Sequence, residues 1–364
     1  MIKPIAFYLP QFHPIPENDQ WWGNGFTEWT NVKKAQPLFP GHEQPVEPGE
    51  LGYYNILDPE IRNRQAELAR EHGVYGFCYW HYWFGNGKTL LEKPLHQVIN
   101  SGEPNFPFCL GWANESWTGI WHGSPDKVLM KQEYPGEDDI IRHFEYILPA
   151  ISDPRYIMVG GRPFFLIYRP KSHPQLSRFV EIFNKLARKH GWDGFHFVAA
   201  NVPQSWPLSK NGFDAWMPPY HHRITWPNSR GRFNKILKWF SNEKKRESSS
   251  PKHVYPYKQA MNYFLPEKKD GKLIYPAVVP NWDNSPRSGN RAVIYTGSTP
   301  ELFKEHLEEA LDLVECNPPS RQIVMIKSWN EWAEGNYIEP DNKWGRAYLE
   351  VLQKAVSQRM NPHE

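Results

Sequence analysis

Two glutamates near the end of the chain are the residues best suited to acid/base chemistry. Glu331 and Glu334 lie three residues apart in the segment Ser328–Gly335, directly after an apolar run. Cleavage of a glycosidic bond requires one protonated and one ionised carboxyl, and two close carboxyls in a partly dry pocket have pKa values that are pushed apart. If the chain turns helical after Trp332, the two Cβ atoms lie roughly 5–6 Å apart. That distance favours the short carboxyl spacing of retaining enzymes. One glutamate could instead cap the turn or pair with an arginine.

Such acids need a scaffold that brings strand ends together. Short β-prone runs alternate with longer helical patterns, which is typical of a parallel sheet wrapped by helices. Eight strands are predicted near Pro4–Pro10, Gly76–Trp83, Phe106–Ala113, Pro163–Arg169, Gly194–Asn201, Phe213–Pro219, Leu273–Pro280 and Gln322–Trp329. Six helices are predicted near Pro59–His72, Leu90–Ser101, Asp138–Ile151, Pro174–His190, Thr299–Cys316 and Gly345–Gln358, with Thr299 as an N-cap.

The alternation favours a closed (β/α)₈ barrel with elaborated loops over an open doubly wound sheet, which would carry a Gly-rich phosphate turn after an early strand. A single catalytic domain is expected over residues 1–364, because α/β barrels reach this length as one domain. Residues 230–251 are polar, basic and without apolar periodicity, and we expect a surface insertion there.

In this fold the carboxyl ends of the strands form the active site. Polar side chains interleaved with aromatic rings follow most of the predicted strands, which describes a pocket for a polyhydroxylated ligand. Each such residue alone could equally close the barrel mouth. The expected substrate-binding residues are Tyr8, Gln11, His13, Trp22, Glu28, Trp29, His81, Tyr82, Trp112, Asn114, Glu115, Asn201, Tyr220, Trp282, Asp283 and Asn330.

Composition narrows the class of partner. A formal net charge of +2 gives no reason to expect nucleic acid or an anionic membrane as a partner, whereas 17 Trp, 18 Tyr and 20 Phe supply flat rings that suit sugar faces. Most of these rings fill the core. Cys78, Cys109 and Cys316 are widely spaced, so neither a disulfide framework nor a zinc site is expected. Without a signal-peptide pattern or an apolar run of membrane length, we expect a cytoplasmic protein unless a leader was removed.

The tail motif resembles a known family. Ser328–Gly335 (SWNEWAEG) followed by Ile338–Pro340 (IEP) is similar to the signature of glycoside hydrolase family 99 and its relatives. The opening and two further strand ends resemble more specifically the WbsX branch, whose members are often described as glycosyltransferases of polysaccharide gene clusters. The segments that carry this second resemblance are Ala6–His13 (AFYLPQFH), Trp22–Gly23, Phe26–Trp29 (FTEW), Gly76–Trp83 (GFCYWHYW) and Gly111–Glu115 (GWANE).

The resemblance implies a (β/α)₈ barrel and a retaining mechanism on α-linked sugars. The residue matching Glu331 takes the proton of the substrate's own 2-hydroxyl, so that a 1,2-anhydro sugar forms, and the residue matching Glu334 protonates the departing oxygen and later activates water. Neither role needs a metal or an organic cofactor. Ala333 stands where mannan-cleaving members usually carry histidine, which puts the substrate, more than the mechanism, in doubt.

Three interpretations therefore follow from the sequence. The leading one is a glycoside hydrolase acting on a bacterial polysaccharide or oligosaccharide. The alternative is a glycosyltransferase of O-antigen-type polysaccharide synthesis, although neither a nucleotide-binding domain nor a clear D-x-D metal site is evident. The third is a non-catalytic carbohydrate-binding barrel, which would have no need for two carboxyls that repel when ionised. The sugar, the linkage and the oligomeric state do not follow from the sequence.

Overall fold

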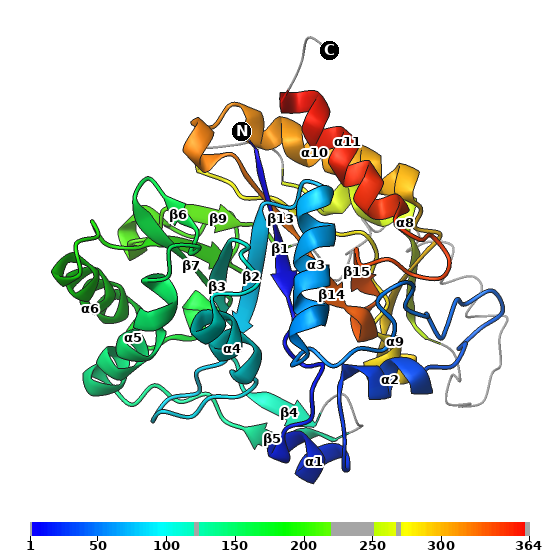
Figure 1. Cartoon of the computed structure of the whole chain (residues 1–364), viewed down its shortest axis with the longest axis horizontal. Helices are drawn as coiled ribbons and strands as arrows, with labels where there is room; N and C mark the ends of the chain where they lie inside the picture. Colours follow the sequence, from blue (N-terminus) through cyan, green and yellow to red (C-terminus); the bar gives the residue numbers. More distant parts are fainter. Residues whose placement is uncertain (1, 120–123, 220–250, 267–270, 361–364) are drawn as a thin grey trace, which may run out of the picture.

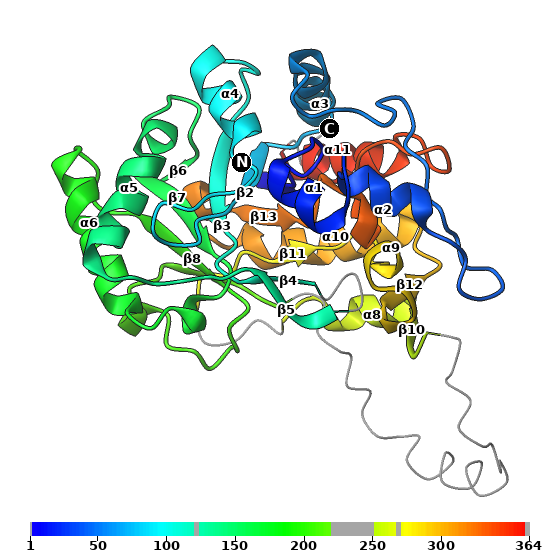
Figure 2. The same ribbon diagram turned by 90° about the horizontal axis from the view of Figure 1, so that it is seen from below.

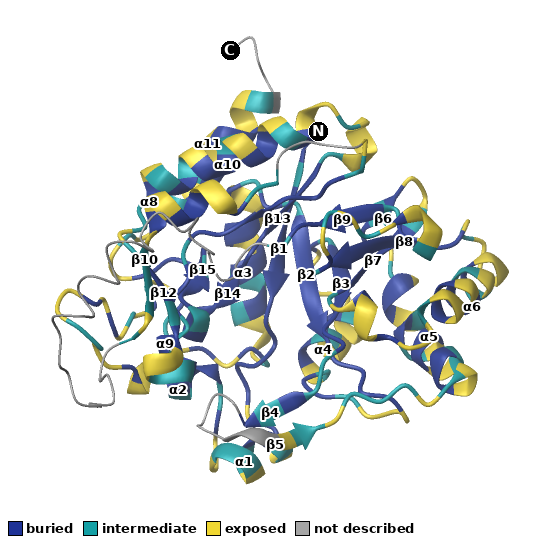
Figure 3. Cartoon of the chain, turned by 180° about the vertical axis from the view of Figure 1, so that it is seen from behind, coloured by how far each residue is buried: buried dark blue, intermediate teal, exposed yellow. Residues whose placement is uncertain are grey.

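The computed structural model describes residues 2–119, 124–219, 251–266 and 271–360. Eight short parallel strands occupy its centre, and their residues are almost all buried (Figures 1 and 3). The strands are β1 (Lys3–Tyr8), β2 (Gly76–His81), β3 (Phe108–Trp112), β7 (Arg162–Ile167), β8 (His196–Ala200), β9 (Ala215–Met217), β11 (Ala277–Val278) and β13 (Ile323–Ile326). Each overlaps one of the eight predicted strands.

These strands pair in the order β11-β13-β1-β2-β3-β7-β8-β9, always in parallel. An isolated parallel bridge between Trp216 and Ile274 joins the two ends of this path, and the amide of Tyr275 donates to the carbonyl of Trp216 over 2.9 Å. The sheet is therefore a nearly closed barrel. The predicted (β/α)₈ fold is confirmed.

Helices cover the outside of the barrel, with their exposed faces turned to solvent (Figure 3). They are α3 (Pro59–Glu71), α4 (Lys93–Ser101), α5 (Glu137–Ile151), α6 (Leu176–Lys189), α10 (Pro300–Glu315) and α11 (Ala347–Met360). All six overlap the predicted helices, and α10 and α11 lie side by side (Figure 1). Between β8 and β9 the chain forms a short 3₁₀ turn, Ser209–Asn211, in place of a long helix. In the described ranges no helix is both long and apolar enough to cross a membrane.

The loops at the carboxyl ends of the strands carry most of the added structure, as Figure 2 shows from that end. They contain α1 (Pro16–Trp22), α2 (Glu28–Lys34), the antiparallel pair β4 (Trp117–Gly119) and β5 (Ser124–Met130), α8 (Tyr257–Ala260), α9 (Ser285–Ser288), the parallel pair β10 (His253–Pro256) and β12 (Val293–Thr296), and the antiparallel pair β14 (Asn330–Glu331) and β15 (Asn336–Tyr337). At the opposite end, β6 (Met158–Val159) pairs with β7. The expected polar insertion lies outside the described residues, apart from residue 251.

Thr299 caps α10 as predicted, because its side chain accepts a hydrogen bond from the amide of Leu302 over 3.3 Å. Replacing a threonine cap with alanine costs about 1 kcal/mol. T299A is therefore expected to unfold at a lower urea concentration than the wild type, with an unchanged slope of free energy against urea. T299S is the matched control, since serine keeps the acceptor. Equal midpoints for T299A and T299S would show that the cap contributes nothing.

Candidate active site

The two glutamates lie on a tight turn directly after β13. Glu331 ends β14 and precedes a 3₁₀ helix, η7 (Trp332–Glu334), of which Glu334 is the last residue. Both carboxyls line one pocket of about 450 Å³ at the carboxyl ends of the strands. The expectation of a helical turn after Trp332 is thus met by a 3₁₀ turn.

Several of the predicted site residues meet in this pocket. Its lining contains Gln11, Trp22, Tyr82, Glu115, Trp282, Glu331 and Glu334 from the predicted set. It also contains residues that the sequence analysis did not single out, among them Trp80, Tyr168, Arg169, Arg287 and Lys327. Aromatic rings and paired charges therefore share the surface, which is the composition expected of a sugar site.

Lys327 lies between the two glutamates. Its ammonium contacts Oε2 of Glu331 and lies 3.7 Å from Oε2 of Glu334. On the other side of Glu331, the indole Nε1 of Trp80 donates to Oε1 over 2.6 Å. Both oxygens of the Glu331 carboxyl are thus held, one by a cation and one by a ring N–H.

Arg287 forms a second bridge. Its guanidinium donates from Nη1 to Oε1 of Glu334 and from Nη2 to Oε1 of Glu28, each over 2.6 Å. The same oxygen of Glu28 accepts from the backbone amide of Ala333 over 3.0 Å, so α2 braces the turn between the two glutamates. Glu28 thus supports the site from behind rather than lining the pocket.

The pKa values of the two glutamates move in opposite directions. Burial raises the pKa of Glu331, and the neighbouring Glu334 adds to this effect while Lys327 opposes it. For Glu334 burial also acts to raise the pKa, but Arg287 and Lys327 outweigh it, and the pKa falls below its usual value. Burial therefore dominates at Glu331, whereas the two cations dominate at Glu334. These directions make Glu331 the more basic carboxyl of the two, whereas the family resemblance gives the acid role to Glu334.

Three predicted residues point out of the barrel instead. Successive residues of a strand face opposite sides, and Tyr8, His81 and Trp112 lie on the side of the helices. The hydroxyl of Tyr8 donates to Oε1 of Gln65 on α3 over 2.6 Å. His81 lies with its Nε2 at 2.9 Å from Nε2 of His143 on α5, and burial lowers its pKa to about 3, which keeps it neutral.

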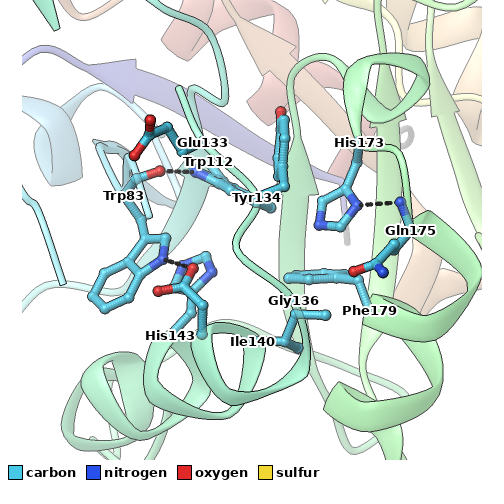
Figure 4. Close-up of a pocket in the computed structure, with 11 residues that line it drawn as sticks. Trp83, Trp112, Glu133, Tyr134, Gly136, Ile140, His143, His173, Gln175 and Phe179 are labelled. Carbon is cyan, nitrogen blue, oxygen red and sulfur yellow. Dashed lines mark hydrogen bonds between the residues drawn. The ribbon is translucent and has the colours of Figure 1, made fainter. Parts of the chain in front are cut away.

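The surroundings of Trp112 show why it does not line the pocket of Glu331 and Glu334. Its ring stacks on Phe179 of α6 with centroids 5.3 Å apart, and its Nε1 donates to the carbonyl of Trp83 over 3.0 Å (Figure 4). The hollow that these residues line, together with His143, has a volume of about 10 Å³. It is far too small for a sugar. Trp112 and His81 therefore pack the barrel against its helices.

Other predicted residues tie the loops together. Asn330 accepts from the amide of Leu9 over 2.7 Å and donates to its carbonyl over 3.1 Å, so the segment that carries the two glutamates is held to the end of β1. Asn114 makes the same double contact with the backbone of Arg169, over 2.7 and 2.9 Å. Asn201 donates to the carbonyl of Tyr168 over 3.3 Å.

Three further predicted residues lie behind or beside the pocket. His13 contacts the carbonyl of Pro10 through Nδ1 over 3.0 Å, and Trp29 donates to the carbonyl of Tyr54 over 2.8 Å. The side chain of Asp283 contacts His42 and Gln44 and faces a different hollow. None of these three residues lines the pocket of Glu331 and Glu334. Tyr220 lies outside the described residues.

The sequence held partial signals for the residues that were missed. Trp80 is adjacent to His81, and strand alternation means that only one of the two can face the pocket. Lys327 is a charged residue at the end of an otherwise apolar strand, which is a costly position unless the charge is paired. Arg287 had no local signal, because its partners Glu28 and Glu334 are distant in the chain.

Comparison with known proteins was made for the sequence and for the structure. A family model described as Glycosyltransferase WbsX matches residues 4–352. The "Uncharacterized protein WxcX" of Xanthomonas campestris pv. campestris strain B100 is 36% identical over 354 residues, covering 97% of this chain and 49% of that protein. The chain thus spans about half the length of the relatives that it matches.

Similar solved structures are glycoside hydrolases. A GH99 endo-alpha-mannosidase from Bacteroides thetaiotaomicron in complex with Bis-Tris propane has a TM-score of 0.60 at 14% identity, covering 99% of this chain and 97% of that chain. A "Glycoside hydrolase-like protein" has a TM-score of 0.59 at 13% identity, covering 97% and 93%. At these identities the likeness shows the fold alone. Because the family model covers nearly the whole sequence, the chain belongs to the WbsX family, on a (β/α)₈ barrel of the kind found in the GH99 endo-alpha-mannosidase.

Proposed function

We propose that this chain is a retaining glycoside hydrolase that cleaves α-linked sugars of a bacterial polysaccharide or oligosaccharide. The observation that carries the proposal is the pair Glu331 and Glu334, which faces one pocket from one turn and has pKa values shifted in opposite directions. Aromatic lining residues, Trp80 and Trp282 among them, supply the flat faces that sugars stack on.

The proposed reaction uses the sugar's own 2-hydroxyl as the nucleophile. Glu331 accepts the proton of this hydroxyl, O2 attacks C1 to form a 1,2-anhydro sugar, and the C1–O bond to the leaving group breaks as Glu334 gives that oxygen a proton. In the second step Glu334 takes a proton from water, the water oxygen attacks C1, and the C1–O2 bond breaks while Glu331 returns its proton to O2. The pair starts and ends with one proton.

The opposite pKa directions fit this cycle when the two carboxyls are treated as one titrating pair. Protons of strongly interacting groups belong to the pair rather than to either member. A proton on Glu331 and a charge on Glu334 differ from the reactive form by transfer of a single proton. In the proposal, substrate contacts that favour an ionised Glu331 complete that transfer.

The lining also favours a neutral sugar over a nucleotide diphosphate. Each of its described cations contacts a carboxylate: Arg169 meets Glu115 over 2.5 Å, Arg287 meets Glu334, and Lys327 meets Glu331. A diphosphate would have to displace those carboxylates to be neutralised. The family name still makes sugar transfer the second candidate, and an experiment has to separate the two.

Removing either carboxyl is expected to abolish hydrolysis. E334Q and E331Q keep the shape of the side chain but cannot exchange the proton, and general acid or base catalysis contributes roughly 10²–10⁴-fold. Sugar release from a panel of α-linked bacterial polysaccharides and oligosaccharides, without added metal or nucleotide sugar, should fall by at least that range. E305Q is the matched control, because Glu305 lies exposed on α10.

Two other outcomes would contradict the proposal. Equal release by E334Q and the wild type would remove Glu334 from the mechanism. If the wild type releases nothing from the panel but elongates an acceptor when a nucleotide sugar is supplied, the protein is a transferase.

Lys327 is expected to set the working pH of the pair. An opposite charge favours the ionised form, and Lys327 lowers the pKa of both Glu331 and Glu334. Removing it in K327M raises both values. The profile of kcat/KM against pH has an acid limb, which requires an ionised Glu331, and an alkaline limb, which requires a protonated Glu334. Both limbs should therefore move to higher pH.

The control for this profile is K210M, since Lys210 is exposed in the 3₁₀ turn after β8. K327R keeps the charge and should leave both limbs nearer their wild-type positions. A folded and active K327M whose two limbs coincide with those of the wild type would show that Lys327 does not control the pair.

A further inference from the structure

A second hollow lies beside the catalytic pocket and has no residue in common with it. Its volume is about 720 Å³, which is within the ~300–1,000 Å³ typical of ligand sites. The lining comes from four segments: 41–47 after β1, 280–283 after β11, 294–298 around β12, and 335–348 after β13. All of them belong to loops at the carboxyl ends of barrel strands, so the hollow opens at the functional end of the barrel.

The two cavities share one wall. Trp282 and Asn284 line the catalytic pocket, whereas Asp283 between them lines the second hollow. Likewise, Glu334 lines the catalytic pocket and Gly335 lines the second hollow. The amide of Asp283 donates to the carbonyl of Glu334 over 2.7 Å, and this bond holds the two halves of the wall together.

Aromatic rings line part of the second hollow. Trp344 and Tyr337 are both half-buried there. Tyr337 is held in place by stacking on Trp332, with centroids 3.8 Å apart, and by donation of its hydroxyl to Asp341 over 2.9 Å. Fixed rings of this kind offer apolar faces with polar edges, which suit the C–H face of a sugar ring.

Two other residues of the lining, Gln44 and Asn281, have side-chain oxygens without a hydrogen-bond partner in the described part of the chain. Gln44 is 7% exposed and donates through Nε2 to Asp283 over 2.7 Å, but its Oε1 has no partner among the described residues. Oδ1 of Asn281 is also without a partner in the described part of the chain. Buried acceptors without donors are unfavourable, and hydroxyl groups of a ligand are the donors that would satisfy them.

The charge of the lining further limits the class of ligand that the hollow can bind. Its carboxylates are Glu43, Glu47, Asp283 and Asp341, and they face Lys343 and His42. Lys343 contacts Glu43 over 2.6 Å, and His42 contacts Asp283 over 2.8 Å. The remaining excess of carboxylates repels anions, so uronic acids and sugar phosphates are unfavourable ligands.

We propose that this hollow is a second binding site for a neutral saccharide, separate from the catalytic pocket. Stacking on Trp344 and hydroxyl donation to Gln44 would hold the sugar. The site does not depend on bond cleavage at Glu331 and Glu334, so it stands or falls independently of the proposed hydrolysis.

Fluorine NMR of the full chain tests this site directly. The protein is labelled with 5-fluorotryptophan in the E334Q background, so that a sugar is not consumed. Signals are assigned by the single variants W344F for the second hollow, W282F for the catalytic pocket and W192F for a remote, half-buried reference between α6 and β8. The probes are the neutral trisaccharides α-mannotriose, maltotriose and N,N′,N″-triacetylchitotriose, with trigalacturonic acid as the anionic comparison.

At least one neutral trisaccharide is expected to move the Trp344 signal in a saturable way while the Trp192 signal stays fixed. Q44A should weaken this binding several-fold without changing the Trp282 response, and trigalacturonic acid should leave the Trp344 signal in place. The proposal is overturned if no neutral trisaccharide moves the Trp344 signal at millimolar concentration, if Q44A binds as tightly as its parent, or if the anionic probe binds equally well. Movement of the Trp282 signal alone would leave the proposed hydrolysis standing and remove the second site.

Discussion

The structure depends on neutralising a cluster of buried charges at the end of the barrel. Glu28, Glu331 and Glu334 share this space with Arg287 and Lys327, and all but Glu334 are at least nine-tenths buried. An unpaired buried ion costs several kcal/mol, so each member needs the others. Three carboxyls against two cations leave one negative charge, which a single proton bound by the cluster would balance.

This constraint explains why the surrounding loops are braced so closely. Asn330 ties the segment that carries the two glutamates to Leu9 at the end of β1, the strand that pairs with β13. Glu28 reaches the amide of Ala333 from α2, and Asp283 reaches the carbonyl of Glu334 from the loop after β11. The pKa values of the two carboxyls depend on short contacts with their neighbours. The backbone that carries the carboxyls must therefore be held firmly in place. The chain segments after two strands, β1 and β11, provide this support.

The sequence predicted the helices, the strands and the place of the glutamate pair at a strand end better than the direction of individual side chains. Hydrophobic periodicity is local, so all eight strands and six helices could be located, and Glu331 and Glu334 fell at a strand end where chemistry is expected. Strands buried on both faces are apolar throughout. The sequence therefore does not show which side chains face the inside of the barrel, as Trp80 does, and which face the helices, as His81 and Trp112 do. The role of Arg287 is visible only after folding, because it joins Glu28 to Glu334 across most of the chain.

Hydrolysis and transfer of the sugar to another saccharide begin with the same step in the proposed reaction. In the proposed mechanism the leaving group departs before the acceptor reacts, so the 1,2-anhydro sugar can be opened by water or by a hydroxyl of another sugar. Glu334 would activate either acceptor by the same proton transfer. In this proposal, the molecule at the acceptor side of the pocket, water or a second sugar, decides between hydrolysis and transfer. The two glutamates act in the same way in both. A second saccharide site directly behind the wall formed by Trp282, Asp283 and Asn284 would hold sugar chains close to that side, and would make the choice of acceptor a property of the loops rather than of the barrel.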